Sequence, residues 1–206
     1  MRHDPAILHA ANPAFGRSTD LGDTTMSEAI RPYDFSDISV LVAEHNSYMR
    51  QTIRSILRTF NIGQIEEART PENAWDAFCL HKPDVVFTDW APGFDGMNLL
   101  KQIRRDDDSP NPFVPVIVVT SMSEKEHVLT ARDLGMTEFL AKPFSPKLIY
   151  LRLRIIAEQP RSFVRTGDFF GPDRRRRQIN VDENRRDDSA NGSAGAARAQ
   201  REESVA

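Results

Sequence analysis

The sequence is poor in cysteine and has no long apolar segment. Its only cysteine, Cys79, excludes an intramolecular disulfide and is typical of a protein kept in a reducing compartment. Its apolar runs fall well short of the roughly 18 residues that span a bilayer. The first residues also lack the continuous apolar stretch of a secretory signal. We therefore expect a cytoplasmic protein with no membrane association, in which Cys79 is a small buried side chain of a helix.

Strong charge of one sign is also missing, and so are several catalytic and DNA-binding motifs. The net charge of −3 gives no global basic field, which disfavours nucleic acid as a partner. The chain shows no helix-turn-helix or zinc-finger pattern, no serine–histidine–acid set with an elbow motif and no metalloprotease helix. These absences disfavour an independent hydrolase, and we expect that the protein is not an enzyme.

Composition divides the chain into three parts. Hydrophobic residues make up 39% and charged residues 28%, enough for a soluble core over part of the length. Residues 1–36 show no lasting helix or strand period, which predicts a disordered leader. Residues 160–206 contain the run Arg174–Arg177 followed by mixed charges, which predicts a mostly disordered, arginine-rich tail. The predicted domain occupies residues 37–159.

Two features of the tail leave alternatives open. The run Arg174–Arg177 is interpreted as solvated, although it could also bind a phosphate backbone or an acidic partner. The residues Phe163, Phe169, Phe170 and Pro172 are unusual in a disordered segment. They favour docking of this part of the tail on the domain or on a partner.

Apolar strands alternate with helices five times in the predicted domain. Each strand is a short apolar run, and the segment after it carries apolar residues at helical spacing. This alternation predicts an α/β fold with a five-stranded parallel sheet and helices on both faces. The predicted strands are 38–43, 64–68, 84–88, 114–119 and 138–141.

Polar side chains follow four of these strands, where the carboxyl ends of parallel strands meet at one edge. The first strand leads to Glu44 and His45, the third to Asp89, the fourth to Thr120 and the fifth to Lys142. Acids, a hydroxyl and an ammonium around a central carboxylate suit phosphoryl transfer onto that carboxylate. Because neighbouring acids repel one another, a hard divalent cation is needed to hold them.

Four motifs follow one another along the chain, each at the end of its own strand: Leu41-Val42-Ala43-Glu44-His45, Asp89-Trp90, Thr120-Ser121 and Lys142-Pro143-Phe144. In this order they resemble the response-regulator receiver domain of two-component signalling, in particular the single-domain, chemotaxis-regulator type. The resemblance covers residues 37–159 and implies a doubly wound, flavodoxin-like (βα)5 sandwich.

The resemblance implies roles for individual residues. Asp89 would accept a phosphoryl group from a sensor histidine kinase or a phosphotransfer protein. Thr120 would move toward the phosphate, and Phe139 would change rotamer with it. Mg²⁺ would be held by Asp89, the backbone carbonyl of Ala91 and the acid-pair positions, here Glu44 and His45.

Further expectations come from the same resemblance. The Lys142-Pro143 bond is expected to be cis, which would aim the lysine into the site. The surface of residues 124–156 would contact a downstream protein, and the apolar residues of its last helix make homodimerisation through this face plausible. Loss of the phosphoryl group would be at most a slow autodephosphorylation.

The sequence departs from the receiver pattern at two places. His45 stands where the family has a second acid, and a neutral imidazole prefers softer metals than Mg²⁺, so cation binding is weakened or shifted toward Mn²⁺. The loop Asp89–Gly96 is one residue shorter than usual and lacks the Met-Pro pair. Two hypotheses therefore stand: a phosphorylation-dependent switch acting through protein contacts, and a pseudo-receiver that binds partners without phosphorylation.

Overall fold

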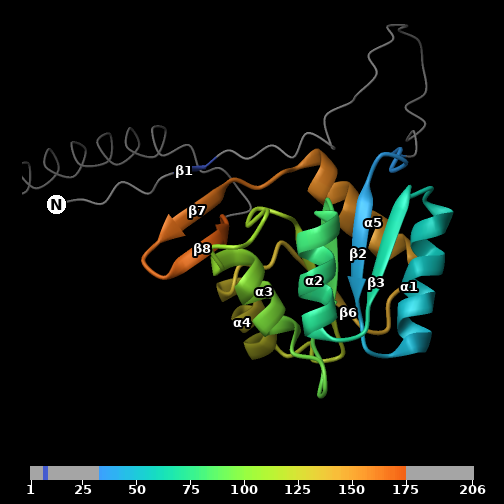
Figure 1. Ribbon diagram of the computed structural model, residues 1–206, viewed down its shortest axis with the longest axis horizontal. Coiled ribbons are helices and arrows are strands. Elements are labelled where there is room, and N and C mark those ends of the chain that lie inside the picture. Colours follow the sequence, from blue (N-terminus) through green and yellow to red (C-terminus); the bar gives the residue numbers. More distant parts are fainter. Residues whose placement is uncertain (1–6, 9–32, 175–206) are drawn as a thin grey trace, which may run out of the picture. The chain divides into compact units, whose positions relative to one another are not determined.

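Five parallel strands form the central sheet of the domain (Figure 1). The computed structural model describes residues 7–8 and 33–174. The strands are paired in the order β3-β2-β4-β5-β6, and all four pairings are parallel. Their bounds are β2 Ser39–Ala43, β3 Gln64–Ala68, β4 Val85–Asp89, β5 Val116–Thr120 and β6 Glu138–Ala141. The predicted five-stranded parallel sheet is confirmed.

A helix follows each of these strands; the first four return the chain to the start of the next strand of the sheet, and the last leads out of it. The helices are α1 Ser47–Thr59, α2 Pro71–His81, α3 Gly96–Arg105, α4 Lys125–Asp133 and α5 Pro146–Glu158. Local chemistry explains several helix starts, since Asn46, Thr70 and Ser145 each accept a backbone N–H bond from the first turn. Within the described residues no helix is long and apolar enough to cross a membrane.

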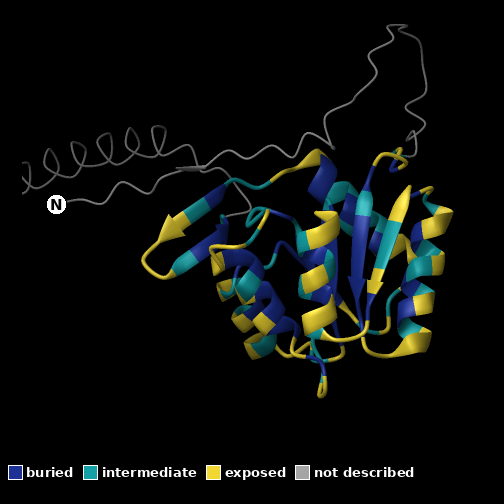
Figure 2. Ribbon diagram, viewed as in Figure 1, coloured by how far each residue is buried: buried dark blue, intermediate teal, exposed yellow. Residues whose placement is uncertain are grey.

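The core has two layers, one on each face of the sheet. Alternate residues of β4 point to opposite faces, so Val85 and Phe87 enter one cluster and Val86 enters the other. Residues of α1 and α5 complete the first cluster, and residues of α2, α3 and α4 complete the second. Figure 2 shows buried residues along the strands and on the inner sides of the helices, as expected for a doubly wound sheet.

Cys79 differs from the expectation of a fully buried side chain. The residue lies on α2, is only partly buried and packs against the second cluster. Partial burial still raises the pKa of its thiol, first through desolvation and then through the negative charges of Asp76, Asp106 and Asp108. The thiol is therefore neutral at physiological pH.

The described structure extends past both predicted bounds of the domain. Phe35 is fully buried in the first cluster and the backbone N–H of Tyr33 donates to the Tyr150 hydroxyl, so the ordered region starts before residue 37. On the other side, residues 160–206 are predicted to be mostly disordered, and within them β7 Phe163–Thr166 and β8 Phe169–Pro172 form a hairpin. The short strand β1 Ile7–Leu8 pairs antiparallel with β7.

The hairpin docks on the domain through an aromatic cluster, which confirms that alternative for the tail. The rings of Phe113, Phe163 and Phe170 lie with centroids 5.2–5.6 Å apart. Arg161 donates to the carbonyl oxygens of Thr137 and Asp173, which joins the segment before the hairpin to the start of β6 and to the end of β8. Most of the predicted leader and tail, including residues 175–177 of the arginine run, lies outside the described residues.

Candidate functional site

The register of the sheet places the polar strand ends side by side. Ala43 pairs with Thr88 between β2 and β4, so Glu44 and Asp89 come next to each other. Thr120 pairs with Ala141 between β5 and β6, and the backbone N–H of Lys142 donates to the Thr120 carbonyl at 2.8 Å. The structure therefore brings the predicted side chains to one edge of the sheet.

Lys142 bridges two buried carboxylates at this edge. Its Nζ lies 2.8 Å from Oδ1 of Asp89 and 2.7 Å from Oε2 of Glu44, and both acids are 1% exposed. A buried carboxylate needs a partner, and one ammonium here serves two. The Lys142-Pro143 peptide bond is cis, as predicted.

His45 completes a triangle of possible metal ligands. Its Nδ1 lies 3.2 Å from Oδ2 of Asp89 and 3.3 Å from Oε1 of Glu44, while the side chain is 44% exposed. One ligand atom from each of these three residues lies within 4.8 Å of the others. His45 thus occupies the solvent side of the acid pair, and its ring stacks on Phe94 at a centroid distance of 6.4 Å.

Thr120 has its hydroxyl bound to the loop that follows the acceptor. The Thr120 Oγ1 donates to the backbone carbonyl of Trp90 and accepts from the N–H of Met122 at 3.0 Å. Its position at the end of β5 is the predicted one, but its hydrogen bond goes to the neighbour of Asp89 rather than to the carboxylate.

Phe139 lies in the sheet rather than at the polar edge. It pairs in register with Val118, two residues before Thr120, and it is partly buried against the second core cluster. This placement suits a core residue and also suits the predicted switch position, because the ring lies on the strand next to that of Thr120.

The loop after Asp89 folds as a tight turn closed by Ala91 and Phe94. Ala91 and Phe94 form an isolated antiparallel bridge, in which the Ala91 carbonyl accepts the Phe94 N–H at 2.9 Å. The Ala91 carbonyl keeps one further lone pair for a cation. Gly96 begins α3 directly beside the acceptor, since a Cβ there would lie 1.8 Å from the backbone oxygen of Asp89.

Two residues important for this geometry were missed from the sequence. Arg50 is only 5% exposed, its Nη1 donates to the Glu44 carbonyl at 2.8 Å, and its Nε pairs with Glu67 at 3.2 Å. In the sequence it looked like one of several arginines on the polar face of a helix. Gly96 carried only a turn signal, and the close approach to Asp89 depends on how the loop packs.

A pocket of about 650 Å³ opens beside the acceptor, between the start of α2 and the loop after β4. Trp90 lines it, as expected of a residue at the mouth of the site, and the indole packs edge-on against His127 at 5.1 Å. Its lining residues are Thr70, Pro71, Glu72, Trp90, Ala91, Gly93, Phe94 and Asp95.

A doubly wound sheet with a buried acid pair and a lysine at its carboxyl edge defines a receiver-type signalling domain. Residues 40–154 match the family model of the response regulator receiver domain, and the chain belongs to this family.

Individual relatives agree with this assignment. The chemotaxis protein CheY1 of Helicobacter pylori is 29% identical over 121 residues, which cover 58% of this chain and 96% of that protein. The receiver domain of a Francisella response regulator has a similar structure, with a TM-score of 0.53 and 26% identity over 58% of this chain and 96% of that one. A chain of the CheX–CheY–BeF3–Mg complex from Borrelia burgdorferi has a similar fold, with a TM-score of 0.52. The two chains are 20% identical, and the match covers 58% of this chain and 88% of that one.

Proposed function

We propose that this domain is a phosphorylation-dependent switch in which Asp89 accepts a phosphoryl group from a phosphohistidine of a sensor kinase or a phosphotransfer protein. The observation that carries the proposal is the Lys142 ammonium, which lies 2.8 Å from the acceptor carboxylate and 2.7 Å from Glu44. An ammonium in this place can hold the carboxylate before transfer and pair with a phosphoryl oxygen afterwards.

In the proposed step, an oxygen of Asp89 forms a bond to phosphorus while the bond between phosphorus and the donor's imidazole nitrogen breaks. The product is an acyl phosphate, and the electron pair of the broken bond stays on the donor imidazole. The domain supplies positioning and charge stabilisation. The partly buried Lys142, held by two carboxylates, supplies positive charge at the site.

A divalent cation fits part of the donor set. Glu44 and Asp89 offer hard carboxylate oxygens and Ala91 a carbonyl oxygen, which suit Mg²⁺, whereas His45 offers a nitrogen better suited to softer ions. We propose Mg²⁺ as the cofactor, with Mn²⁺ as the alternative. When bound, the ion would supply positive charge that offsets the charge of the phosphoryl oxygens.

In the proposed switch, Thr120 responds to phosphorylation of Asp89. Its hydroxyl is bound to the Trp90 carbonyl, and a phosphoryl group on Asp89 offers a more strongly charged acceptor close by. Exchange of that hydrogen bond would release Trp90 and let Phe139 change rotamer on the neighbouring strand. We propose that the surface formed by α4, β6 and α5 then contacts a downstream protein, and that the acyl phosphate is lost only by slow hydrolysis.

Phosphorylation of the full chain tests this function. Incubation with acetyl phosphate and Mg²⁺ or Mn²⁺ should add one phosphoryl group, measured by intact-protein mass spectrometry. Asp89→Asn should add none, because the amide is not a nucleophile of this kind. Asp95→Asn is the matched control, since Asp95 is an exposed acid that caps α3 in the same loop, and it should still be modified. Absence of the adduct in the unmodified chain under all these conditions would contradict the proposal.

The contacts of His45 favour a second candidate, a binding module that signals without phosphorylation. The imidazole lies against both acids at 3.2 and 3.3 Å, where a cation would otherwise approach them. Beryllofluoride with Mg²⁺ separates the candidates, because it mimics the acyl phosphate and is present with CheY in the Borrelia burgdorferi complex. Shifts of the Thr120 and Phe139 resonances that require Asp89 would reject this second candidate. Restoration of binding only in His45→Asp would favour it.

A further inference from the structure

A second pocket lies between the end of α3 and the β7–β8 hairpin. It has a volume of about 470 Å³, within the range of about 300–1,000 Å³ typical of small-molecule sites. Pro112 lines it just before β5 begins, whereas Asp89 lies where β4 ends. The pocket is therefore at the opposite edge of the sheet from the acceptor, and the proposed phosphoryl transfer does not use it.

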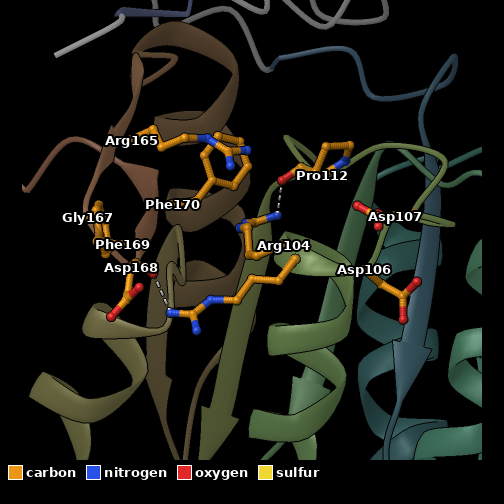
Figure 3. Close-up of a pocket in the computed structure, with 11 residues that line it drawn as sticks. Arg104, Asp106, Asp107, Pro112, Arg165, Gly167, Asp168, Phe169 and Phe170 are labelled. Carbon is orange, nitrogen blue, oxygen red and sulfur yellow. Dashed lines mark hydrogen bonds between the residues drawn. The ribbon is translucent and has the colours of Figure 1, made fainter. Parts of the chain in front are cut away.

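Arg104 forms the centre of this pocket (Figure 3). Its side chain is 2% exposed, its Nε donates to the Gly135 carbonyl at 2.9 Å and its Nη1 donates to the Pro112 carbonyl at 2.8 Å. Its guanidinium carbon lies 5.1 Å from the centroid of Phe163. Within the described part of the chain, the buried Nη2 has no hydrogen-bond partner and no carboxylate pairs with this arginine.

This arrangement leaves a positive charge buried without a counter-ion. Burial lowers the pKa of the Arg104 guanidinium to about 9, so the group remains cationic at neutral pH. A buried charge held only by neutral carbonyl groups and a ring is poorly compensated. The free edge of a guanidinium matches the geometry of a phosphate or carboxylate group, which would provide the missing charge.

Other lining residues define what such a ligand would meet. Arg165 is exposed, and its guanidinium carbon lies 4.7 Å from the centroid of Phe170, so it adds a second cation at the mouth of the pocket. Arg105 reaches across to donate to the backbone carbonyl of Asp168. Asp106 and Asp107 are exposed carboxylates on another part of the lining, and they would repel a ligand that is anionic all over.

We propose that this pocket binds a small molecule through one phosphate or carboxylate group, which Arg104 and Arg165 hold between α3 and the hairpin. The uncharged or amino-bearing part of the ligand would face Asp106 and Asp107. Because Arg104 also binds the Gly135 carbonyl directly after α4, the ligand would stabilise the contact between the hairpin and the α4–β6 connection.

Binding can be measured on the full chain without divalent cations, so that the acceptor site does not bind phosphate through a metal. Phosphoethanolamine, with one phosphate and one ammonium group, and acetate, with one carboxylate and a methyl group, are the two probes. Each is compared with chloride at the same ionic strength by two-dimensional NMR. We expect one of them to shift the signals of Arg104, Arg165 and Phe170. Shifts with phosphoethanolamine alone would identify a phosphate site, and shifts with acetate alone would identify a carboxylate site.

Variants separate this pocket from the arginine-rich tail. Arg104→Gln should raise the dissociation constant of the active probe about tenfold, since a charged hydrogen-bond donor is lost. Arg165→Gln, which changes an exposed residue and leaves the core intact, should raise it severalfold. Arg58→Gln removes an exposed arginine from the end of α1 and should leave it unchanged.

Two results would overturn the proposal. The first is that neither probe shifts the pocket signals, including the case in which only residues of the tail respond. The second is that Arg165→Gln binds the active probe as the unmodified chain does. If Arg104→Gln fails to fold, Arg165→Gln still decides between these outcomes.

Discussion

At the scale of single residues, the balance of charge at the acceptor is decided by Lys142. Two carboxylates, each about 1% exposed, share this one ammonium, while the nearby Arg50 guanidinium donates to the backbone carbonyl of Glu44. The lysine is therefore as much a structural residue as a functional one, because without it two like charges remain buried together.

Lys142→Met should lower the free energy of unfolding by about 3 kcal/mol, the size expected when one partner of a buried ion pair is removed. Urea unfolding in the absence of divalent cations measures this loss. Neutralising one acid in the same background, in Lys142→Met with Glu44→Gln, should recover most of it, because the repulsion between carboxylates disappears. If the double variant is as unstable as Lys142→Met, charge is not the cause.

The functional residues that the sequence predicted share one property, which is their position at the end of an apolar strand. Asp89, Thr120 and Lys142 needed only the rule that parallel strands end at one edge. Arg50 could not be found this way, because its burial depends on the packing of α1 against Glu44 and Glu67. Ala91 was named through the resemblance alone, and the pairing of its carbonyl with the Phe94 N–H depends on how the loop folds.

At the scale of secondary-structure elements, the start of α3 fixes the shape of the acceptor loop. Asp95 caps the helix by accepting the N–H of Asn98, and Gly96 places the first turn against the backbone of Asp89. The helix and the loop are thus positioned together, and a side chain at residue 96 would separate them.

Gly96→Ala tests this coupling. Its Cβ would lie 1.8 Å from the Asp89 carbonyl oxygen and 2.6 Å from Thr88 Oγ1, so the backbone must shift. We expect a loss of about 2 kcal/mol in the free energy of unfolding and slower phosphorylation by acetyl phosphate. Asn98→Ala, at an exposed position of the same helix, should leave the phosphorylation rate unchanged. An unchanged rate in Gly96→Ala would mean that the loop adapts without moving the acceptor.

At the scale of the whole described domain, the hairpin shows how a boundary is missed from sequence. The periodic pattern ends with α5 near residue 159, and the following residues look like the start of a charged tail. The aromatic residues were the only signal of order. Phe163 and Phe170 are ordered because they pack against Phe113, which lies before β5 and far from them in the sequence.

Two shortened chains test where the domain ends, one stopping after Gln159 and one after Asp173. The shorter chain loses the burial of Phe163 and Phe170, which are 6% and 4% exposed, and the contacts of Arg161 with Thr137. The shorter chain exposes two aromatic rings that the full chain buries, so we expect a loss of about 2 kcal/mol in the free energy of unfolding. Arg104 keeps its bonds to Gly135 and Pro112 in both chains, and its renewed hydration limits the loss. In thermal and urea unfolding, the chain ending at Asp173 should therefore be as stable as the full chain. The chain ending at Gln159 should be less stable than both. Equal stability of the two shortened chains would show that the hairpin contributes nothing to the stability of the fold, and that its contacts serve the pocket alone.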